Sequence, residues 1–410
     1  MNARRRSIPW KASPPRLLGI CIGLLAAAIV LAMTDGRQTL AISGPIISEC
    51  DGRIRSIAIQ YVRGADFAAP VYRQFLGELP ADVTVYAVCP DRESFEELQS
   101  RLGSESSRKA SPPRWKASPP RWKASPPRWK ASPPRWKASP PRRLRAILTG
   151  HPMTAWSRDR WISLRPGRHE SAGTLVASRG EFGGQIWPQR QGDQRIAEDL
   201  ARALGRPAIR SGLYFDGGDF LADSRSVFIA PGAIARNVQH TCGDESELSQ
   251  IVRRQLGLNP ILLKDAPDHH AGMFMMAAGE GRVVVCDPKL AKGLLAPMEL
   301  PGGPDFSDST QRRFDSVAAA SAAAGYRVTR IPCVPSCDGK TFITFVNGII
   351  DQRDGRRTIY MPTYEGQARL NAAGERVWEN LGYRVVPIDV TSTFRYFGTL
   401  HCLVNVIEKD

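Results

Sequence analysis

A cysteine near the C-terminus is the first residue of this chain that could carry out a reaction. It lies in FGTLHCLVN, residues 397–405, where Gly398 precedes His401 and Cys402. A thiolate is a strong nucleophile, so a cysteine in such a loop can attack an electrophilic carbon. The alternative is a packed core thiol, because free cysteine is among the most buried residue types. The choice depends on which other reactive side chains the chain offers.

Three further stretches place acidic or imidazole side chains among apolar residues. They are WSRDRWI (156–162), FDGGDFLAD (215–223) and DHHAGMFM (268–275). Each has a structural alternative: Asp159 could form an ion pair, Asp-Gly-Gly-Asp could be a tight turn, and a histidine at a strand start could be structural. Taken singly, none of these stretches indicates a function.

Taken together and in this order, the four stretches resemble the guanidino-group-modifying (amidinotransferase/deiminase) superfamily. Within it, agmatine deiminases and bacterial-type peptidylarginine deiminases are the most similar. Four matches carry the resemblance: Trp156-Ser157-Arg158-Asp159 with Trp-x-Arg-Asp, Asp216-Gly217-Gly218 with an acid before Gly-Gly, His270 with the histidine of His-x-Asp, and Gly398 to Cys402 with the C-terminal nucleophile loop. The stretches VFIAPGAIARN (227–237), FVNGII (345–350) and YMPTY (360–364) are similar too.

The resemblance implies a role for each matched residue. The expected nucleophile is Cys402, and the expected general acid and base is His270. The implied reaction passes through a covalent thiouronium and requires no metal and no cofactor. Carboxylates suit a guanidinium because they accept hydrogen bonds from its planar fork of N–H groups. The expected substrate contacts are Asp159, Asp216, Asp219, Trp156 and Arg158.

One position departs from the family pattern. The acid of His-x-Asp would fall at residue 272, where this chain has Gly272. Either Asp219 or Asp268 supplies the missing carboxylate, or substrate binding is weakened, or the site has lost its original activity. Because His269 directly precedes His270, either residue could be the motif histidine. The His-x-x-Met-Phe context favours His270.

Most of the net charge of +16 lies in two segments. Residues 1–16 contribute +5 and residues 109–142 contribute +10, which leaves about +1 for the remainder. The body of the chain is therefore not predicted to bind nucleic acid. The eight cysteines are scattered, and the lone CVPSC pair at 333–337 has no second pair at zinc spacing. Disulfides are possible in an exported protein, but their connectivity does not follow from the sequence.

The N-terminal segment, residues 1–45, predicts export. Its basic start is followed by LLGICIGLLAAAIVLAM, residues 17–33, and by small residues near 41–43. We expect a cleaved signal peptide or a membrane anchor, and hence a periplasmic, extracellular or anchored protein. Contact with a membrane is expected only through this segment.

A repeat interrupts the remaining chain at 105–143, where KASPPRW occurs four times and is followed by KASPPR. The Pro-Pro of every copy excludes a coiled coil, so we expect an extended, disordered insertion. It could bind anionic polymers or lipid, or it could be a tandem expansion tolerated in a surface loop.

Strand-like and helix-like stretches alternate through residues 46–410, which indicates an α/β protein. Runs rich in β-branched and aromatic residues predict strands at 84–89, 226–230, 282–287, 342–350, 357–362 and 383–390. Apolar residues three and four apart predict helices at 94–102, 193–204, 245–256, 314–325 and 366–382. Several helices are separated by two or three strands, which argues against a simple doubly wound sheet. The resemblance implies a pentein α/β-propeller, with five pseudo-repeated ββαβ-like units in residues 46–410.

The leading hypothesis is an exported cysteine-dependent hydrolase that deiminates a guanidino compound and releases ammonia. Its expected partner is a small guanidino molecule such as agmatine, or the arginine side chain of a peptide. An amidinotransferase would share the thiouronium intermediate. A catalytically impaired protein that binds a cationic ligand would retain the same fold. The oligomeric state does not follow from the sequence.

Overall fold

The computed structural model describes residues 44–103, 144–180 and 190–410. The expected leader, residues 1–45, lies almost wholly outside these ranges, and so does the repeat at 105–143. No helix within the three ranges is long and apolar enough to cross a membrane. The seven cysteines that they contain are free thiols, and only Cys337 is exposed.

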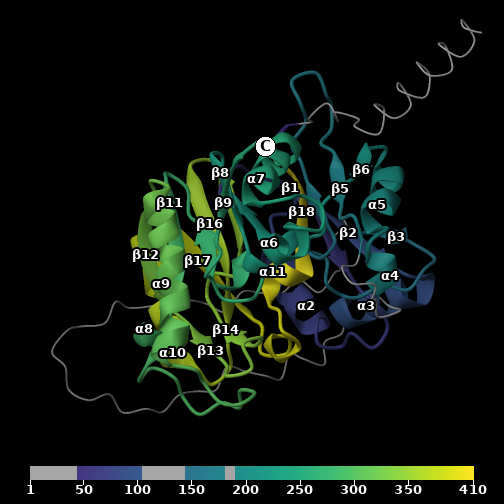
Figure 1. Cartoon of the computed structure of the whole chain (residues 1–410). Coiled ribbons are helices and arrows are strands. Elements are labelled where there is room, and N and C mark those ends of the chain that lie inside the picture. The colour runs from purple at the N-terminus through teal and green to yellow at the C-terminus, as the bar shows by residue number, and fades with distance from the viewer. Residues whose placement is uncertain (1–43, 104–143, 181–189) are drawn as a thin grey trace, which may run out of the picture. The chain divides into compact units, whose positions relative to one another are not determined.

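Five sheets of the described chain share one topology (Figure 1). In each sheet an antiparallel pair of strands is followed by a strand parallel to the second member of the pair. The three-stranded sheets are β4 (Trp161–Ser163), β5 (Leu175–Ala177) and β6 (Ala208–Arg210); β7 (Phe220–Ala222), β8 (Ser226–Ile229) and β9 (Asn259–Leu262); β10 (Met275–Ala277), β11 (Arg282–Asp287) and β12 (Arg327–Pro332); and β15 (Ile349–Arg353), β16 (Arg356–Thr363) and β17 (Tyr383–Asp389).

The remaining large sheet joins segments from opposite ends of the described chain. Its order is β18 (Val404–Lys409), β1 (Ile54–Gln60), β2 (Thr84–Cys89) and β3 (Leu144–Leu148). The last strand runs antiparallel to β1, with Ile59 opposite Val404. This pairing fixes the segment that directly follows Cys402. A short antiparallel pair, β13 (Val334–Pro335) and β14 (Phe342–Ile343), stands apart from the five sheets.

Helices connect the parallel strands of each sheet, as parallel pairing requires a crossover. They are α2 (Ala69–Glu78), α3 (Arg92–Gly103), α4 (Arg190–Asp193), α5 (Ile196–Leu204), α6 (Pro231–Asn237), α7 (Glu245–Leu256), α8 (Pro288–Ala291), α9 (Asp308–Ala323) and α10 (Ala368–Asn380). Short helical turns lie at η3 (Gly217–Asp219), η4 (Ala271–Met273), η5 (Phe394–Tyr396) and α11 (Leu400–Leu403). The α/β class predicted from the sequence is confirmed by this arrangement.

Helix α7 illustrates how the sequence determines these elements. The side chain of Asp244 accepts a hydrogen bond from the Glu247 N–H at the helix start, a cap that stabilises a helix by about 1 kcal/mol. The buried residues Leu248 and Val252 lie one turn apart and face the core. Gly257 then ends the helix with a φ of 71°, a conformation that glycine adopts without steric cost.

Two predicted elements are wrong in their extent. The stretch 342–350 is not one strand, because Thr344 gives its N–H to the Tyr364 hydroxyl instead of to a neighbouring strand. The chain therefore turns between β14 and β15, and Asn347 lies in this turn. The stretch 193–204 is not one helix either, since α4 ends at Asp193 and α5 begins at Ile196, after a break of two residues. The Asp193 carboxylate accepts hydrogen bonds from the N–H and hydroxyl of Thr154, which anchors the end of α4.

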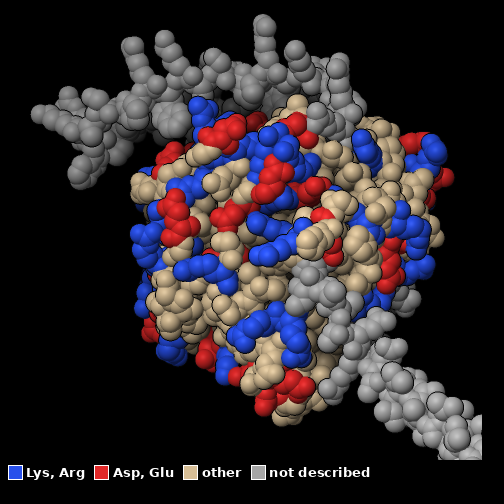
Figure 2. All heavy atoms as spheres, turned by 90° about the horizontal axis from the view of Figure 1, so that it is seen from above, with Lys and Arg blue, Asp and Glu red and all other residues tan. Residues whose placement is uncertain are grey.

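Charged side chains of both signs are interspersed on the face shown in Figure 2. The near-neutral charge calculated for the chain outside its two basic segments accounts for this mixture. The largest of the three apolar core clusters in the described chain includes residues of β1, β11 and β16.

Candidate active site

Cys402 lies on the one-turn helix α11, directly before β18. Its side chain is buried, and its Sγ lies 3.5 Å from Asn347 Oδ1. The preceding Gly398 lets the loop pass very close to an indole: a Cβ at this position would lie 2.6 Å from the Trp156 ring and 3.1 Å from Cys402 Cβ. Trp156, which we predicted as a substrate contact, thus packs against the loop that precedes Cys402.

His270 directly precedes the short turn η4. Its Nε2 lies 3.5 Å from Asp216 Oδ2, and the Cys402 side chain is close enough to contribute to the pKa of the ring. Burial alone would lower the pKa of His270, but these two contacts and nearby carboxylates raise it well above its usual value. The imidazolium form is therefore favoured. The ring leaves no room for a side chain at Gly218, where a Cβ would lie 2.5 Å from Nδ1.

The adjacent His269 has a different environment. Its Nδ1 accepts a hydrogen bond from the His270 N–H at 2.8 Å, and its Nε2 lies 3.0 Å from the Lys340 carbonyl oxygen. An acceptor at Nδ1 and a donor at Nε2 define a neutral imidazole. Burial and the charge of His270 lower the pKa of His269 to about 3. The geometry therefore brings His270 to the thiol and leaves His269 as a support for its backbone.

The two predicted guanidinium carboxylates, Asp159 and Asp216, lie together in the interior. Burial, together with the charge of Asp216, raises the pKa of Asp159. Burial also acts to raise the pKa of Asp216, but the hydrogen bond with His270 and the charge of Arg160 hold it well below its usual range. Arg160 Nε lies 3.2 Å from Asp216 Oδ1.

Asp159, Asp216 and His270 each direct one ligand atom to a common point, with all three atoms within 4.8 Å of one another. Such a set could coordinate a cation in principle. The raised pKa of His270 and the arginines paired with the carboxylates oppose a metal ion there. A ligand that donates hydrogen bonds suits this charge pattern better.

Asp219 is fully engaged within the protein. Its Oδ2 accepts a hydrogen bond from the Asp216 N–H at 2.7 Å and pairs with Arg236 of helix α6. These contacts close the tight turn at Gly217–Gly218. Asp268, the other candidate for the missing acid, is exposed and lines a separate surface pocket.

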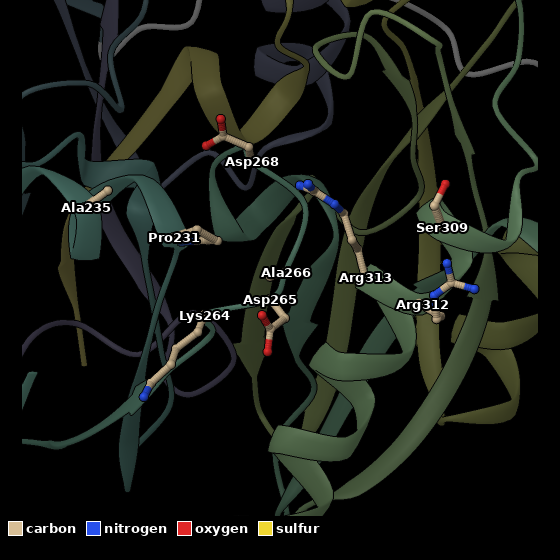
Figure 3. Close-up of a pocket in the computed structure, with 9 residues that line it drawn as sticks. All are labelled: Pro231, Ala235, Lys264, Asp265, Ala266, Asp268, Ser309, Arg312 and Arg313. Atoms are coloured by element: carbon tan, nitrogen blue, oxygen red, sulfur yellow. The ribbon is translucent and has the colours of Figure 1, made fainter.

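That pocket has a volume of about 520 Å³ and lies beside α6 and the start of α9 (Figure 3). Its lining mixes basic and acidic side chains, among them Lys264, Asp265, Asp268, Arg312 and Arg313. Neither the thiol nor the buried carboxylates contribute to it. We therefore assign the chemistry to the buried cluster around Cys402.

Arg158 faces away from the carboxylate pair. Its guanidinium forms a buried ion pair with Glu49 and lies 3.5 Å from Asn405 Oδ1. Glu49 uses its other oxygen to accept from His401 Nε2 at 3.0 Å. The residues that precede Cys402 and Asp159 are thus held by one carboxylate, which was not predicted from the sequence.

Gly272 lies where the family acid would stand. A Cβ at this position would lie 3.0 Å from His401 Nδ1 and 3.3 Å from Asn347 Nδ2. The space for a carboxylate side chain is therefore already bounded by these two groups. The Gly272 carbonyl oxygen accepts a hydrogen bond from Asn347 Nδ2 at 3.0 Å.

Asn347 connects the two loops that carry the thiol and the imidazole. In addition to its bond to Gly272, its Oδ1 accepts hydrogen bonds from the Thr399 hydroxyl at 2.6 Å and the His401 N–H at 3.1 Å. Its position in the similar stretch FVNGII, as the one polar residue among apolar neighbours, was the available sequence signal. Arg190, which lies between the two carboxylates, gave no such signal.

A buried thiol, an imidazole and paired carboxylates meet in a fold that is shared with enzymes acting on guanidino groups. Solved agmatine deiminases have this fold. The enzyme from C. jejuni is 11% identical, with 89% of this chain and 96% of that chain covered and a TM-score of 0.61. The enzyme from Enterococcus faecalis is 12% identical, with 90% and 98% covered and a TM-score of 0.62.

A structure provisionally assigned as a peptidyl-arginine deiminase is also similar. It is 12% identical, with 90% of this chain and 100% of that chain covered and a TM-score of 0.60. The resemblance predicted from the sequence is therefore confirmed at the level of the fold. No family model matches the chain, and no curated protein matches its sequence.

Proposed function

We propose that this protein is a cysteine-dependent hydrolase that deiminates a guanidino compound. The observation that supports it best is the position of His270, in contact with the Cys402 thiol on one side and the Asp216 carboxylate on the other. The fold shared with agmatine deiminases, one of them solved with substrate bound, also supports it. Agmatine and the arginine side chain of a peptide are the candidate substrates.

Substrate binding uses the buried carboxylates. Asp159 and Asp216 accept hydrogen bonds from the guanidinium nitrogens, and two such charge-assisted contacts orient the planar group. The bound cation lies beside Cys402, and the thiolate form of this residue is the nucleophile.

The first chemical step forms a C–S bond. The Cys402 thiolate attacks the central guanidino carbon, and the C–N bond to one terminal nitrogen breaks as His270 donates its proton to it. Ammonia leaves, and the remaining atoms form a thiouronium on Cys402. His270, now neutral, then accepts a proton from water as the water attacks the same carbon. The C–S bond breaks, a neutral urea product leaves, the second proton passes to the solvent, and the thiolate returns.

The test compares two alkylating reagents of nearly equal size. Chloroacetamidine carries a cationic head that resembles a guanidinium, and chloroacetamide is its neutral counterpart. We expect chloroacetamidine to label Cys402 at least tenfold faster than chloroacetamide does, as followed by peptide mass spectrometry. The exposed Cys337 is the internal control and should show no comparable preference.

Two variants separate the carboxylate site from general thiol reactivity. Asp159→Asn and Asp216→Asn should reduce the preference for the cationic reagent, whereas Asp268→Asn, on the surface pocket, should leave it unchanged. Equal rates for both reagents at Cys402 in the wild type would refute a guanidinium site beside the thiol. Labelling without turnover of any guanidino compound would instead favour a protein that binds a cation without converting it.

Hydrolysis and amidino transfer share the thiouronium intermediate. Release of ammonia and a urea product from agmatine, in the absence of any amine acceptor, is the outcome expected for a hydrolase. A requirement for an added amine would assign the protein to the transferases.

The proposal also covers the type of fold and the cellular location. We infer that the five sheets correspond to the five units of a pentein propeller, since each repeats the same antiparallel and parallel pairing. We also propose that residues 1–45 direct the protein out of the cytoplasm as a signal peptide or anchor. Cell fractionation of the full chain, followed by N-terminal peptide mapping, tests this localisation and its mode.

A further inference from the structure

The guanidinium of Arg190 already lies between the two carboxylates of the candidate site. Its Nη2 is 3.1 Å from Asp159 Oδ2 and 3.2 Å from Asp216 Oδ1. Arg190 starts helix α4, far in sequence from both acids, and its side chain is 29% exposed. The protein thus supplies from its own chain the same chemical group that the proposed substrate would bring.

One nitrogen of Arg190 uses an oxygen of each carboxylate, while the other oxygen of Asp216 faces His270. Arg160 pairs with Asp216 as well. An additional guanidinium bound by both carboxylates would have to share the oxygens of Asp216 with Arg190, Arg160 and His270, and cations so close together repel each other.

We propose that Arg190 is an internal ligand of the guanidinium site, and that an external guanidino compound binds only when Arg190 leaves it. This inference rests on the proposed function, because it assigns the site to guanidinium ligands. The strength of the Arg190 contact therefore sets the binding free energy that a substrate must supply to displace it. Departure of its side chain is feasible because nearly a third of it is already exposed and helix α4 is only four residues long.

Competition of this kind has a calculable effect. The apparent dissociation constant equals the intrinsic one divided by the fraction of molecules in which the site is open. If Arg190 occupies the site in about nine molecules of ten, binding is weakened about tenfold.

The experiment measures agmatine binding by calorimetry at pH 8 in a Cys402→Ser background, which prevents turnover. Arg190→Gln removes the internal ligand, and we expect it to lower the dissociation constant at least tenfold. The matched control is Arg195→Gln, which makes the same change of charge at an exposed position five residues further on. We expect the control to change the dissociation constant less than twofold.

A second readout needs no agmatine affinity. Phenylglyoxal, which modifies accessible arginines, should label Arg190 at least tenfold more slowly than Arg195. Equal agmatine affinities in the Arg190→Gln and Arg195→Gln variants would overturn the inference while leaving the proposed function intact. If neither agmatine nor an arginine-containing peptide binds to any variant, the proposed function fails, and phenylglyoxal decides the internal contact: protection of Arg190 supports it, and labelling at the Arg195 rate overturns it.

Discussion

Removal of the Glu49 carboxylate should cost more stability than any surface ion pair of this protein. Glu49 is buried and pairs with Arg158 and with His401, whose side chains are 7% and 2% exposed. In Glu49→Ala, the Arg158 guanidinium remains buried without the carboxylate that compensates its charge. Breaking a buried pair in this way costs about 3–5 kcal/mol. We expect a decrease of that size in the free energy of unfolding at pH 7.5.

The assay is urea denaturation followed by tryptophan fluorescence, with linear extrapolation to water. The matched control is Glu93→Ala, which breaks the exposed Arg63–Glu93 pair and should cost at most about 1 kcal/mol. A loss in Glu49→Ala no larger than in this control would refute the reasoning that the buried pair stabilises the fold.

The same change predicts a dependence on pH. Burial would raise the pKa of Glu49, but the charges of Arg158 and His401 lower it well below its ordinary value of 4.5. A carboxylate of this kind stabilises the fold above its ordinary pKa, and the stabilisation is lost as the pH falls below it. The difference between wild type and Glu49→Ala should therefore narrow below about pH 4.5.

Three other perturbations test the site and its surroundings. Asn347→Ala removes the link between the loops of Cys402 and His270, so chloroacetamidine should label Cys402 at least tenfold more slowly. An unchanged labelling rate would exclude a positioning role for Asn347. Gly218→Ala places a methyl group against the His270 ring, and ammonia release should fall about a hundredfold, since misplacement by about 1 Å can cost that much; full activity would contradict the close packing. Burial raises the pKa of Asp193 to about 7, so this carboxyl stabilises the fold below its ordinary pKa of 3.8 and loses that contribution as the pH rises to about 7. Asp193→Asn should thus raise the urea midpoint by an amount that grows between those values, and a constant difference would refute the assignment.

Most strands and helices were predictable because their buried apolar residues recur at the spacing of a strand or a helix. The stretches 84–89, 245–256 and 282–287 coincide with β2, α7 and β11. The errors are more instructive. The predicted strand at 342–350 is apolar enough for a β-strand, yet Thr344 bonds to a tyrosine hydroxyl and the chain turns there. No local pattern reveals a partner twenty residues away.

Only those residues of the candidate site that lie in the matched motifs were predictable from the sequence. Asp159, Asp216, His270 and Cys402 lie together as the resemblance implied. Their supports could not be read in the same way. A buried glutamate such as Glu49 looks like any surface acid in a sequence, because its partners are brought to it by tertiary folding. Arg158 belongs to the matched motif, yet it contacts Glu49 and not the expected substrate site. The motif alone therefore did not reveal its contact.

The pairing of β18 with β1 also has a consequence for folding kinetics. Ile59 and Val404 are neighbours across this pair but some 345 residues apart in sequence. Contacts between such distant residues raise the contact order and slow folding, because a very large loop must close before they form. The Cys402 thiol lies on the segment that reaches its final position only when this loop closes. Catalytic activity should therefore return with the slowest refolding phase, after most of the helical circular dichroism signal has already recovered.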